Sequence, residues 1–69
     1  MNRTPVSSSN IASIGFDEAT SVLEVEFLAG SIYQYFDVPL AYYEGLLTAS
    51  SVGGYFNTNI KNSFAYSRL

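Results

Sequence analysis

The chain has 69 residues with a net charge of −3, and it contains neither cysteine nor histidine. This length suits one domain with a thin hydrophobic core, and without cysteine no disulfide or thiolate metal site can supplement its packing. Without histidine the chain lacks the commonest general base and the commonest transition-metal ligand. The acidic balance also argues against non-specific nucleic-acid binding through a basic patch. Composition therefore favours a non-catalytic domain that needs no metal and no cofactor.

Two further features of the composition bear on location and on binding. No segment approaches the length of a membrane span, and the first ten residues lack the apolar core of a secretory signal, so we expect a cytoplasmic protein without a membrane partner. The chain also contains five phenylalanines and six tyrosines. A thin core is not expected to bury all of these rings, and tyrosine tolerates an interface because its body is apolar and its tip polar. Some of the tyrosines are therefore candidates for a binding surface.

The first ten residues are polar and contain a proline and a run of serines, which is typical of a tail or of a loop that leads into a domain. We expect the single domain to occupy residues 11–69. Its first strand is predicted over residues 11–16, with residues 12, 14 and 16 on one face and residues 11, 13 and 15 on the other. After a turn at residues 17–21, the alternation of Leu23, Val25 and Phe27 with two glutamates predicts a second strand.

A third strand is predicted over residues 32–36, and its register depends on the turn that precedes it. A two-residue turn at residues 29–30 pairs Phe27 with Ile32. A three-residue turn at residues 29–31 pairs Phe27 with Tyr33, and Val25 with Tyr35. We favour the three-residue turn because it gathers the large apolar and aromatic groups on one face. The other face then holds Leu28, Ile32 and Phe36 with Glu24, Glu26 and Gln34.

The second half of the chain is predicted to be largely helical. Val38-Pro39 ends the sheet, because the residue before proline prefers an extended backbone and proline suits the first position of a helix. Apolar residues then recur at helical spacing, and we expect this stripe to cover the tyrosine face of the sheet. The stripe consists of Pro39, Tyr42, Tyr43, Leu46 and Leu47. Ser51 is predicted to cap a short second helix, and the alternation from Phe64 to Leu69 suits either a fourth strand or an extended tail.

The predicted fold is therefore α+β: a three-stranded antiparallel β-meander packed by one main helix, followed by a short second helix and an extended C-terminal segment. Several short motifs occur along it in an order that resembles one family, the KTSC domain. They are Ser8-Ser9, Ile14-Gly15-Phe16-Asp17, Leu23-x-Val25-x-Phe27, Gly30, Tyr33-x-Tyr35, Val38-Pro39 and Ser51-x-Gly53-x-Tyr55-Phe56-Asn57-x-x-Ile60. No single motif is specific, but their order and spacing cover nearly the whole chain.

The KTSC domain is named for the C-terminus of some lysyl-tRNA synthetases and also occurs alone in short bacterial and phage proteins. The resemblance implies a central Tyr-x-Tyr motif, here Tyr33 and Tyr35, and an association with RNA through the synthetase connection. Relatives often carry several basic residues in the region that corresponds to residues 57–68, whereas here Thr58, Asn62 and Ser63 are neutral. This departure argues against extensive contact with phosphates.

Two groups of residues allow a catalytic or binding interpretation beside a structural one. The Cα atoms of Glu24 and Glu26 are expected roughly 6.5 Å apart, as in some catalytic carboxylate pairs. A solvated strand face explains them without a substrate, and such charges discourage edge-to-edge aggregation. We therefore expect no catalytic residue and no metal site. Tyr33 and Tyr35 are either a platform on which RNA bases stack or, as we favour, core residues beneath the first helix.

The candidate binding residues combine amide, cationic and aromatic side chains near the C-terminus, where a solvated helix end would also give this pattern. They are Asn57, Asn59, Lys61, Asn62, Tyr66 and Arg68. The leading hypothesis is a non-catalytic module for single-stranded or loop RNA, since three cations neutralise few phosphates and the affinity must come from stacking and amide contacts. The alternative is a protein-interaction or self-assembling module of a bacterial or phage protein, with Leu28, Ile32 and Phe36 mediating self-association.

Overall fold

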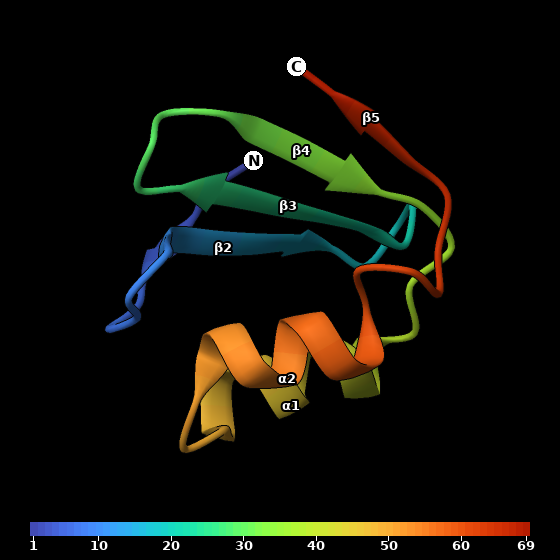
Figure 1. Ribbon diagram of the computed structural model, residues 1–69. Coiled ribbons are helices and arrows are strands. Elements are labelled where there is room, and N and C mark those ends of the chain that lie inside the picture. Colours follow the sequence, from blue (N-terminus) through green and yellow to red (C-terminus); the bar gives the residue numbers. More distant parts are fainter.

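A computed structural model describes residues 1–69 as an antiparallel sheet with two helices packed on one of its faces (Figure 1). The strands are β1 (Thr4–Pro5), β2 (Ile11–Asp17), β3 (Val22–Phe27), β4 (Ile32–Tyr35) and β5 (Tyr66–Arg68), and the helices are α1 (Leu40–Thr48) and α2 (Val52–Asn59). The five strands lie in the sheet in the order in which they occur in the chain. The predicted α+β class is confirmed, and the predicted meander forms the centre of a larger sheet.

Short strands extend the meander at both edges. At one edge, β1 pairs with β2, so part of the segment predicted as a tail belongs to the sheet. At the other edge, β5 pairs with β4, which places Tyr66 opposite Tyr35 and Arg68 opposite Tyr33. The sequence left open whether the C-terminal end is a strand or an extended tail, and the structure shows a strand. Tyr66 and Arg68 therefore share the sheet face of the tyrosine pair.

The turn between β3 and β4 has three residues, as predicted, but it begins one residue earlier. Val25 lies opposite Tyr33 and Leu23 opposite Tyr35, so the predicted register is wrong by two residues. The reason is Gly30, whose φ of 103° suits the last position of a three-residue hairpin turn rather than its middle. The shift leaves each side chain on its predicted face, because side chains alternate with a period of two.

A bulge in β2 overturns the predicted alternation of the first strand. Ile11 pairs with Phe27, but the next pair is Ser13 with Glu26, so Ala12 is the extra residue. The bulge reverses the direction of Ile11 relative to the rest of the strand. Ile11 and Ile14, which the sequence placed on opposite faces, are consequently both fully buried in the core.

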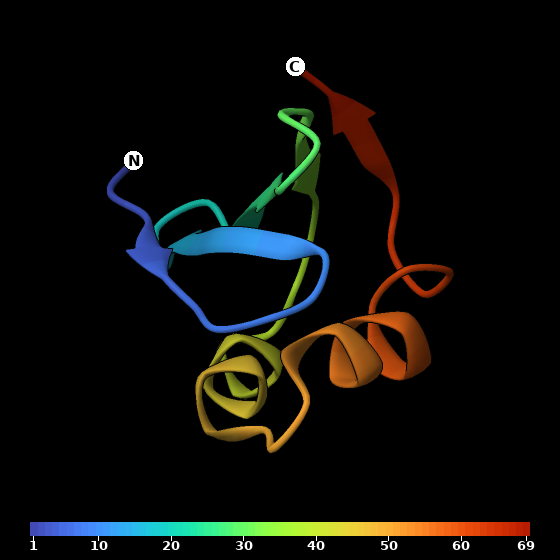
Figure 2. The same ribbon diagram turned by 60° about the vertical axis from the view of Figure 1, so that its left-hand side comes forward.

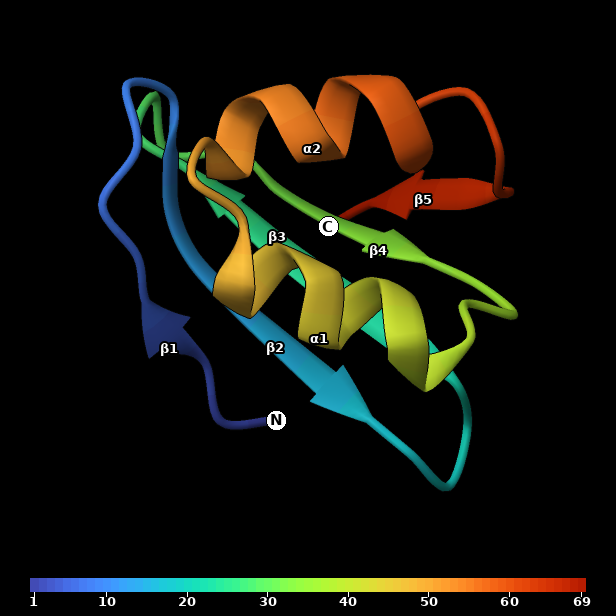
Figure 3. The same ribbon diagram turned by 90° about the horizontal axis from the view of Figure 1, so that it is seen from below.

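Both helices cover the sheet, whereas the sequence predicted that the first helix alone would cover its tyrosine face. α1 follows Pro39 as predicted and packs over β2, but within its apolar stripe only Leu46 is fully buried, while Leu47 is 46% exposed. α2 is capped by Ser51, whose hydroxyl oxygen accepts from the Gly54 N–H at 3.1 Å. Seen from below, α2 lies beside α1 on the same face of the sheet (Figure 3). Its Phe56, rather than α1, packs against the tyrosine face of the sheet.

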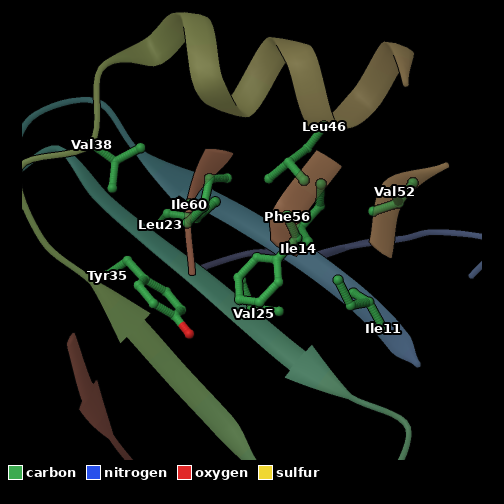
Figure 4. Close-up of a cluster of buried hydrophobic side chains, with 10 residues drawn as sticks. All are labelled: Ile11, Ile14, Leu23, Val25, Tyr35, Val38, Leu46, Val52, Phe56 and Ile60. Atoms are coloured by element: carbon green, nitrogen blue, oxygen red, sulfur yellow. The ribbon is translucent and has the colours of Figure 1, made fainter. Parts of the chain in front are cut away.

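The core is one cluster of ten buried side chains between the sheet and the helices, drawn in Figure 4. Leu46 of α1, together with Val52 and Phe56 of α2, reaches down onto side chains that rise from β2, β3 and β4. The two helices pack closely because Gly45 has no side chain, and the Tyr55 hydroxyl group occupies the space where a Cβ would stand. Neither helix has the length and apolar character needed to cross a membrane.

Candidate functional site

An open groove lies between the sheet and α2, where the β3–β4 turn, β4 and β5 meet the end of the helix. Figure 2 shows β5 at the edge of the sheet, above the end of α2. Its volume is about 590 Å³, within the range of small-molecule sites. Residues near both chain ends contribute to it, from Ser9 to Tyr66.

Aromatic rings form the floor of the groove and grade from the core to the solvent. Tyr35 is buried, Tyr33 is half-buried and Tyr66 is 59% exposed. The ring centroid of Tyr33 lies 6.4 Å from that of Tyr35 and 5.7 Å from that of Tyr66. Phe27 and Phe56 meet each other edge-on at 5.6 Å and support this floor from the core side. A flat ligand entering the groove can thus stack on rings that are already held in place.

Burial raises the pKa of the Tyr35 hydroxyl above its ordinary value of 10.0, and the neighbouring hydroxyls of Tyr33 and Tyr66 raise it further. Tyr35 is therefore neutral over the physiological range and belongs to the core. Tyr33 is partly accessible and lines the groove. The structure thus gives the two tyrosines different positions, and the element above them is α2 instead of α1.

The charge of the groove differs from that of the whole chain. Lys61 is the one charged residue in its lining, and no carboxylate lines it, although the chain carries six acidic residues. Arg68 lies beside the groove, with its guanidinium carbon 6.0 Å from the centre of the Tyr33 ring, a cation–π distance. An acidic protein therefore presents a locally cationic and aromatic groove.

The asparagine side chains near the groove are of two kinds: some have no hydrogen-bond partner in the chain, and one is hydrogen-bonded to the backbone. Asn57 and Asn62 are exposed, line the groove and form no hydrogen bond within the chain. Asn59, in contrast, donates from Nδ2 to the Tyr55 carbonyl oxygen at 3.2 Å and lies outside the groove. Of the six predicted binding residues, four line the groove, Arg68 flanks it and Asn59 lies elsewhere: the four are Asn57, Lys61, Asn62 and Tyr66.

The sequence prediction missed the contribution of the loop before β2. Ser9 and Asn10 line the groove. The Ser8 hydroxyl oxygen accepts from the backbone N–H groups of Asn10 and Ile11, both at 3.3 Å, which fixes the loop. The absence of a side chain at Gly53 lets this loop approach α2, since a Cβ there would lie 2.6 Å from Asn10 Oδ1. The family motifs at Ser8-Ser9 and Gly53 were the available signal.

The glutamates that suggested a catalytic pair belong to a closed polar network on the outer face of the sheet. Glu24 is only 6% exposed, forms an ion pair with Arg3 and accepts from Gln34 Nε2 at 3.0 Å. Burial acts to raise the Glu24 pKa, but the hydrogen bonds from Gln34 and Arg3 outweigh it and lower the pKa below its ordinary value of 4.5. The sequence predicted a solvated strand face, and this is wrong for Glu24, because the N-terminal segment covers it.

The residues considered for self-association do not form one bare patch. Leu28 is 60% exposed, but it lies in the β3–β4 turn and lines the groove. Ile32 and Phe36 are half-buried. On the outer face, Arg3 also donates from Nε to Ser13 Oγ at 3.1 Å, so its side chain lies across part of the surface that the sequence left uncovered.

The fold and the site define a small α+β module with an aromatic groove at one end of its sheet. Residues 7–64 match the model of the KTSC domain, and the chain belongs to this family. The resemblance that the sequence motifs indicated is thereby confirmed. A crystal structure of a KTSC domain protein from Yersinia pestis superposes with a TM-score of 0.93 at 39% identity, covering 99% of this chain and 96% of that one.

Relatives occur both as short proteins and as small parts of long ones. A protein of Stutzerimonas stutzeri is 41% identical over 61 residues, which cover 88% of this chain and 86% of that protein. A lysine–tRNA ligase of a Nostoc species is 46% identical over 54 residues. That match covers 78% of this chain but only 10% of the ligase. The same module thus exists by itself and within a much larger enzyme.

Proposed function

We propose that the protein is a small non-catalytic module that binds single-stranded or loop RNA in the groove between α2 and strands β4 and β5. The observation that carries the proposal is the lining of the groove, which combines accessible tyrosine rings, two free amides and one lysine with no carboxylate. Sites for single-stranded nucleic acid combine positive charge with aromatic rings on which bases stack. In an acidic chain, a groove free of carboxylates favours an anionic ligand.

The small number of cations favours unpaired bases over a duplex. Lys61 and Arg68 at the groove neutralise at most two phosphates, so counterion release contributes little and the logarithmic salt slope is expected to be about −0.7 to −1.4 for a single strand. The remaining affinity has to come from stacking, at roughly 1–3 kcal/mol per base. Only bases that are unstacked, as in loops and single strands, can reach Tyr33 at the floor.

The family adds support of a different kind. Lysine–tRNA ligases contain a closely similar module as a tenth of their length, and their name connects them with tRNA. An RNA-binding role for the module accounts for its presence in such a protein. The argument is one of association, and the groove chemistry is what gives it physical content.

A titration of labelled single-stranded RNA at two salt concentrations tests the proposal. Tyr66→Ala is expected to weaken binding by about 5-fold to 150-fold with little change in the salt slope, because it removes a stacking surface. Lys61→Ala is expected to weaken binding less but to reduce the salt slope by about 0.7, because it removes one phosphate contact.

Asn57 and Asn59 provide a matched pair of controls on the same helix. Asn57→Ala removes a free amide from the groove, whereas Asn59→Ala changes an amide outside it. The first substitution is expected to weaken RNA binding and the second to leave it unchanged. Absence of binding at about 100 µM protein in low salt, where even non-specific complexes form, would reject the proposal.

Self-association is the second candidate, and the free edge of β5 favours it. All three residues of β5 are exposed, and β4 is its one partner in the sheet. An unpaired strand edge can recruit the same edge of another copy, and the exposed Leu28 adds apolar surface near this end of the sheet. If this function holds, light scattering will show a dimer at high micromolar concentration, and Leu28→Glu, which places a charge on the exposed apolar surface, will convert it to a folded monomer. A monomeric wild-type protein would exclude it.

A further inference from the structure

We infer that the groove is a site for one unpaired adenine nucleotide, with the base on the tyrosine floor and a phosphate on Lys61. This inference rests on the proposed function for the choice of groove and of ligand class, and it goes further by naming the base and the number of nucleotides bound. It is carried by four observations: the size of the groove, the arrangement of the tyrosine rings at its floor, the free amides at its rim and the position of its single cation.

The size of the groove limits the ligand to about one nucleotide. A groove of about 590 Å³ has the size of a small-molecule site and is too small for a length of chain. The accessible rings are likewise few, since Tyr35 is only 4% exposed and leaves Tyr33 and Tyr66 as stacking surfaces. Longer RNA would therefore place one base in the groove and extend away from it.

The rings at the floor favour a purine. The centroids of Tyr33 and Tyr66 lie 5.7 Å apart with their planes tilted by 45°, so the two rings form an angled surface instead of a slot. A ligand that spans this surface gains more contact the larger its own ring system is, since dispersion attraction adds over atom pairs. A fused two-ring purine therefore stacks better here than a one-ring pyrimidine.

The free amides select adenine among the purines. An asparagine amide presents a donor and an acceptor side by side, which matches the N6 amino group and N7 of adenine. Guanine presents two acceptors at the same edge and is matched instead by arginine or lysine. Asn57 and Asn62 are both exposed and unpaired within the chain, whereas the one cation in the lining is Lys61.

The position of Lys61 assigns it to the phosphate. It lies in the turn after α2, between Ile60, which is buried in the core, and Asn62 at the rim. A lysine is a compact point charge on a flexible stem, which suits a phosphate whose position varies. Arg68 is already held over the Tyr33 ring and stabilises that ring as part of the floor.

NMR titration of the ¹⁵N-labelled full-length protein with mononucleotides tests the inference directly. The expected order of affinity is AMP above GMP, and GMP above UMP and CMP, with AMP at least about 5-fold tighter than UMP. The side-chain amide signals of Asn57 and Asn62 should move with AMP, while that of Asn59 should not. UMP or GMP binding as tightly as AMP would overturn the adenine assignment.

Two variants separate the contributions of base and phosphate. Lys61→Gln should lower the affinity for AMP to that for adenosine while leaving adenosine binding unchanged, because only AMP carries a phosphate. Asn57→Ala should reduce the preference for AMP over GMP, and Asn59→Ala serves as its matched control. An equal loss of AMP and adenosine binding in Lys61→Gln would refute the phosphate contact.

Parallel titrations with adenine-rich and uracil-rich single-stranded octanucleotides distinguish failure of this inference from failure of the proposed function. Binding of both octanucleotides without preference would refute the adenine site and leave RNA binding in place. Binding of AMP without binding of either octanucleotide would refute the RNA function and retain the nucleotide site. Preference for the adenine-rich strand together with the AMP order supports both.

Discussion

The two faces of the sheet are built from the same strands but use their polar groups in opposite ways. On the outer face, both oxygens of the Glu24 carboxylate have partners, Arg3 on one and Gln34 on the other. Ser13 connects this network to Glu26 through a hydrogen bond of 2.8 Å. On the helix-side face, the groove leaves two amides and one lysine without partners in the chain and two tyrosine rings accessible.

The difference has a physical origin in the cost of burying each kind of group. A buried carboxylate is tolerated only when it is paired, so the outer face has to be closed by a cation from the N-terminal segment. Gly15 permits this closure, since a Cβ there would lie 2.6 Å from the Asn2 carbonyl oxygen. A tyrosine ring can remain half-exposed at little cost. Polar groups with hydrogen-bond partners therefore stabilise the fold of this domain, and polar groups without partners line its candidate site.

The comparison can be tested most strongly at Phe56, which connects the core to the groove floor. Its ring is 2% exposed and lies edge-on to Phe27 at 5.6 Å and to Tyr35 at 5.4 Å. Phe56→Ala is expected to reduce the free energy of unfolding by about 3–5 kcal/mol, as removal of a buried aromatic ring does. Urea unfolding followed by circular dichroism measures this loss.

Leu47 provides the matched control for Phe56. It is 46% exposed on α1, and Leu47→Ala is expected to change the free energy of unfolding by less than about 0.5 kcal/mol. This pair of substitutions separates the observed helix packing from the sequence prediction, in which Leu47 covered the tyrosine face. A larger loss at Leu47 than at Phe56 would favour the predicted arrangement over the observed one.

Arg3 is the corresponding test on the outer face. Arg3→Ala leaves Glu24 buried without its cation, and we expect a loss of about 1–3 kcal/mol in the free energy of unfolding. The effect is smaller than for a fully buried pair because the Arg3 side chain is 27% exposed. Arg3→Lys keeps the charge and should lose less. RNA affinity should stay the same in both variants, and a parallel loss of RNA affinity would show that the two faces are coupled.

The sequence predicted the faces of β3 and β4 correctly because a hydrophobic period of two decides them. It missed the register because that depended on which turn position Gly30 takes. β1 was missed because no hydrophobic pattern predicts a two-residue strand, which is held here by two pairs with β2 and by the ion pair of Arg3. The bulge at Ala12 was equally hidden, since it depends on pairing with β3.

The candidate site was predictable in part, for a similar reason. The C-terminal residues were identified by the mixture of amide, cationic and aromatic side chains, which is a local property of the sequence. Asn57 and Asn59 lie two positions apart on α2 and thus on different sides of the helix, and composition alone could not separate them. Asn10 was missed because folding brings it to the groove from far along the chain.

The pH dependence of stability sharpens the comparison further, because Glu24 has a lowered pKa. Burial raises that pKa, but Gln34 and Arg3 lower it by more, to below the ordinary value of 4.5. The unfolded chain therefore binds this proton first, and the stabilisation is fully present above pH 4.5 and lost as the pH falls through the folded-state pKa. Glu24→Gln should flatten the acid limb of stability against pH. An unchanged acid limb in Glu24→Gln would contradict the assignment.

The smallest expected effect is that of salt, and it separates charge from packing. Raising the ionic strength from about 0.01 M to 1 M shortens the screening length from about 30 Å to 3 Å, but a pair that is largely buried is screened much less than an exposed one. The stability difference between the wild type and Arg3→Ala should therefore shrink by less than about 0.5 kcal/mol. The difference between the wild type and Phe56→Ala should not shrink, because ring packing carries no net charge. Urea unfolding of the three proteins at both salt concentrations measures the two differences under identical conditions.

If the Arg3 difference disappears in high salt, the Arg3–Glu24 pair behaves as an exposed ion pair, and the outer face is open to solvent. If it persists nearly unchanged, the hydrogen bonds of the network, rather than its charges at a distance, close that face.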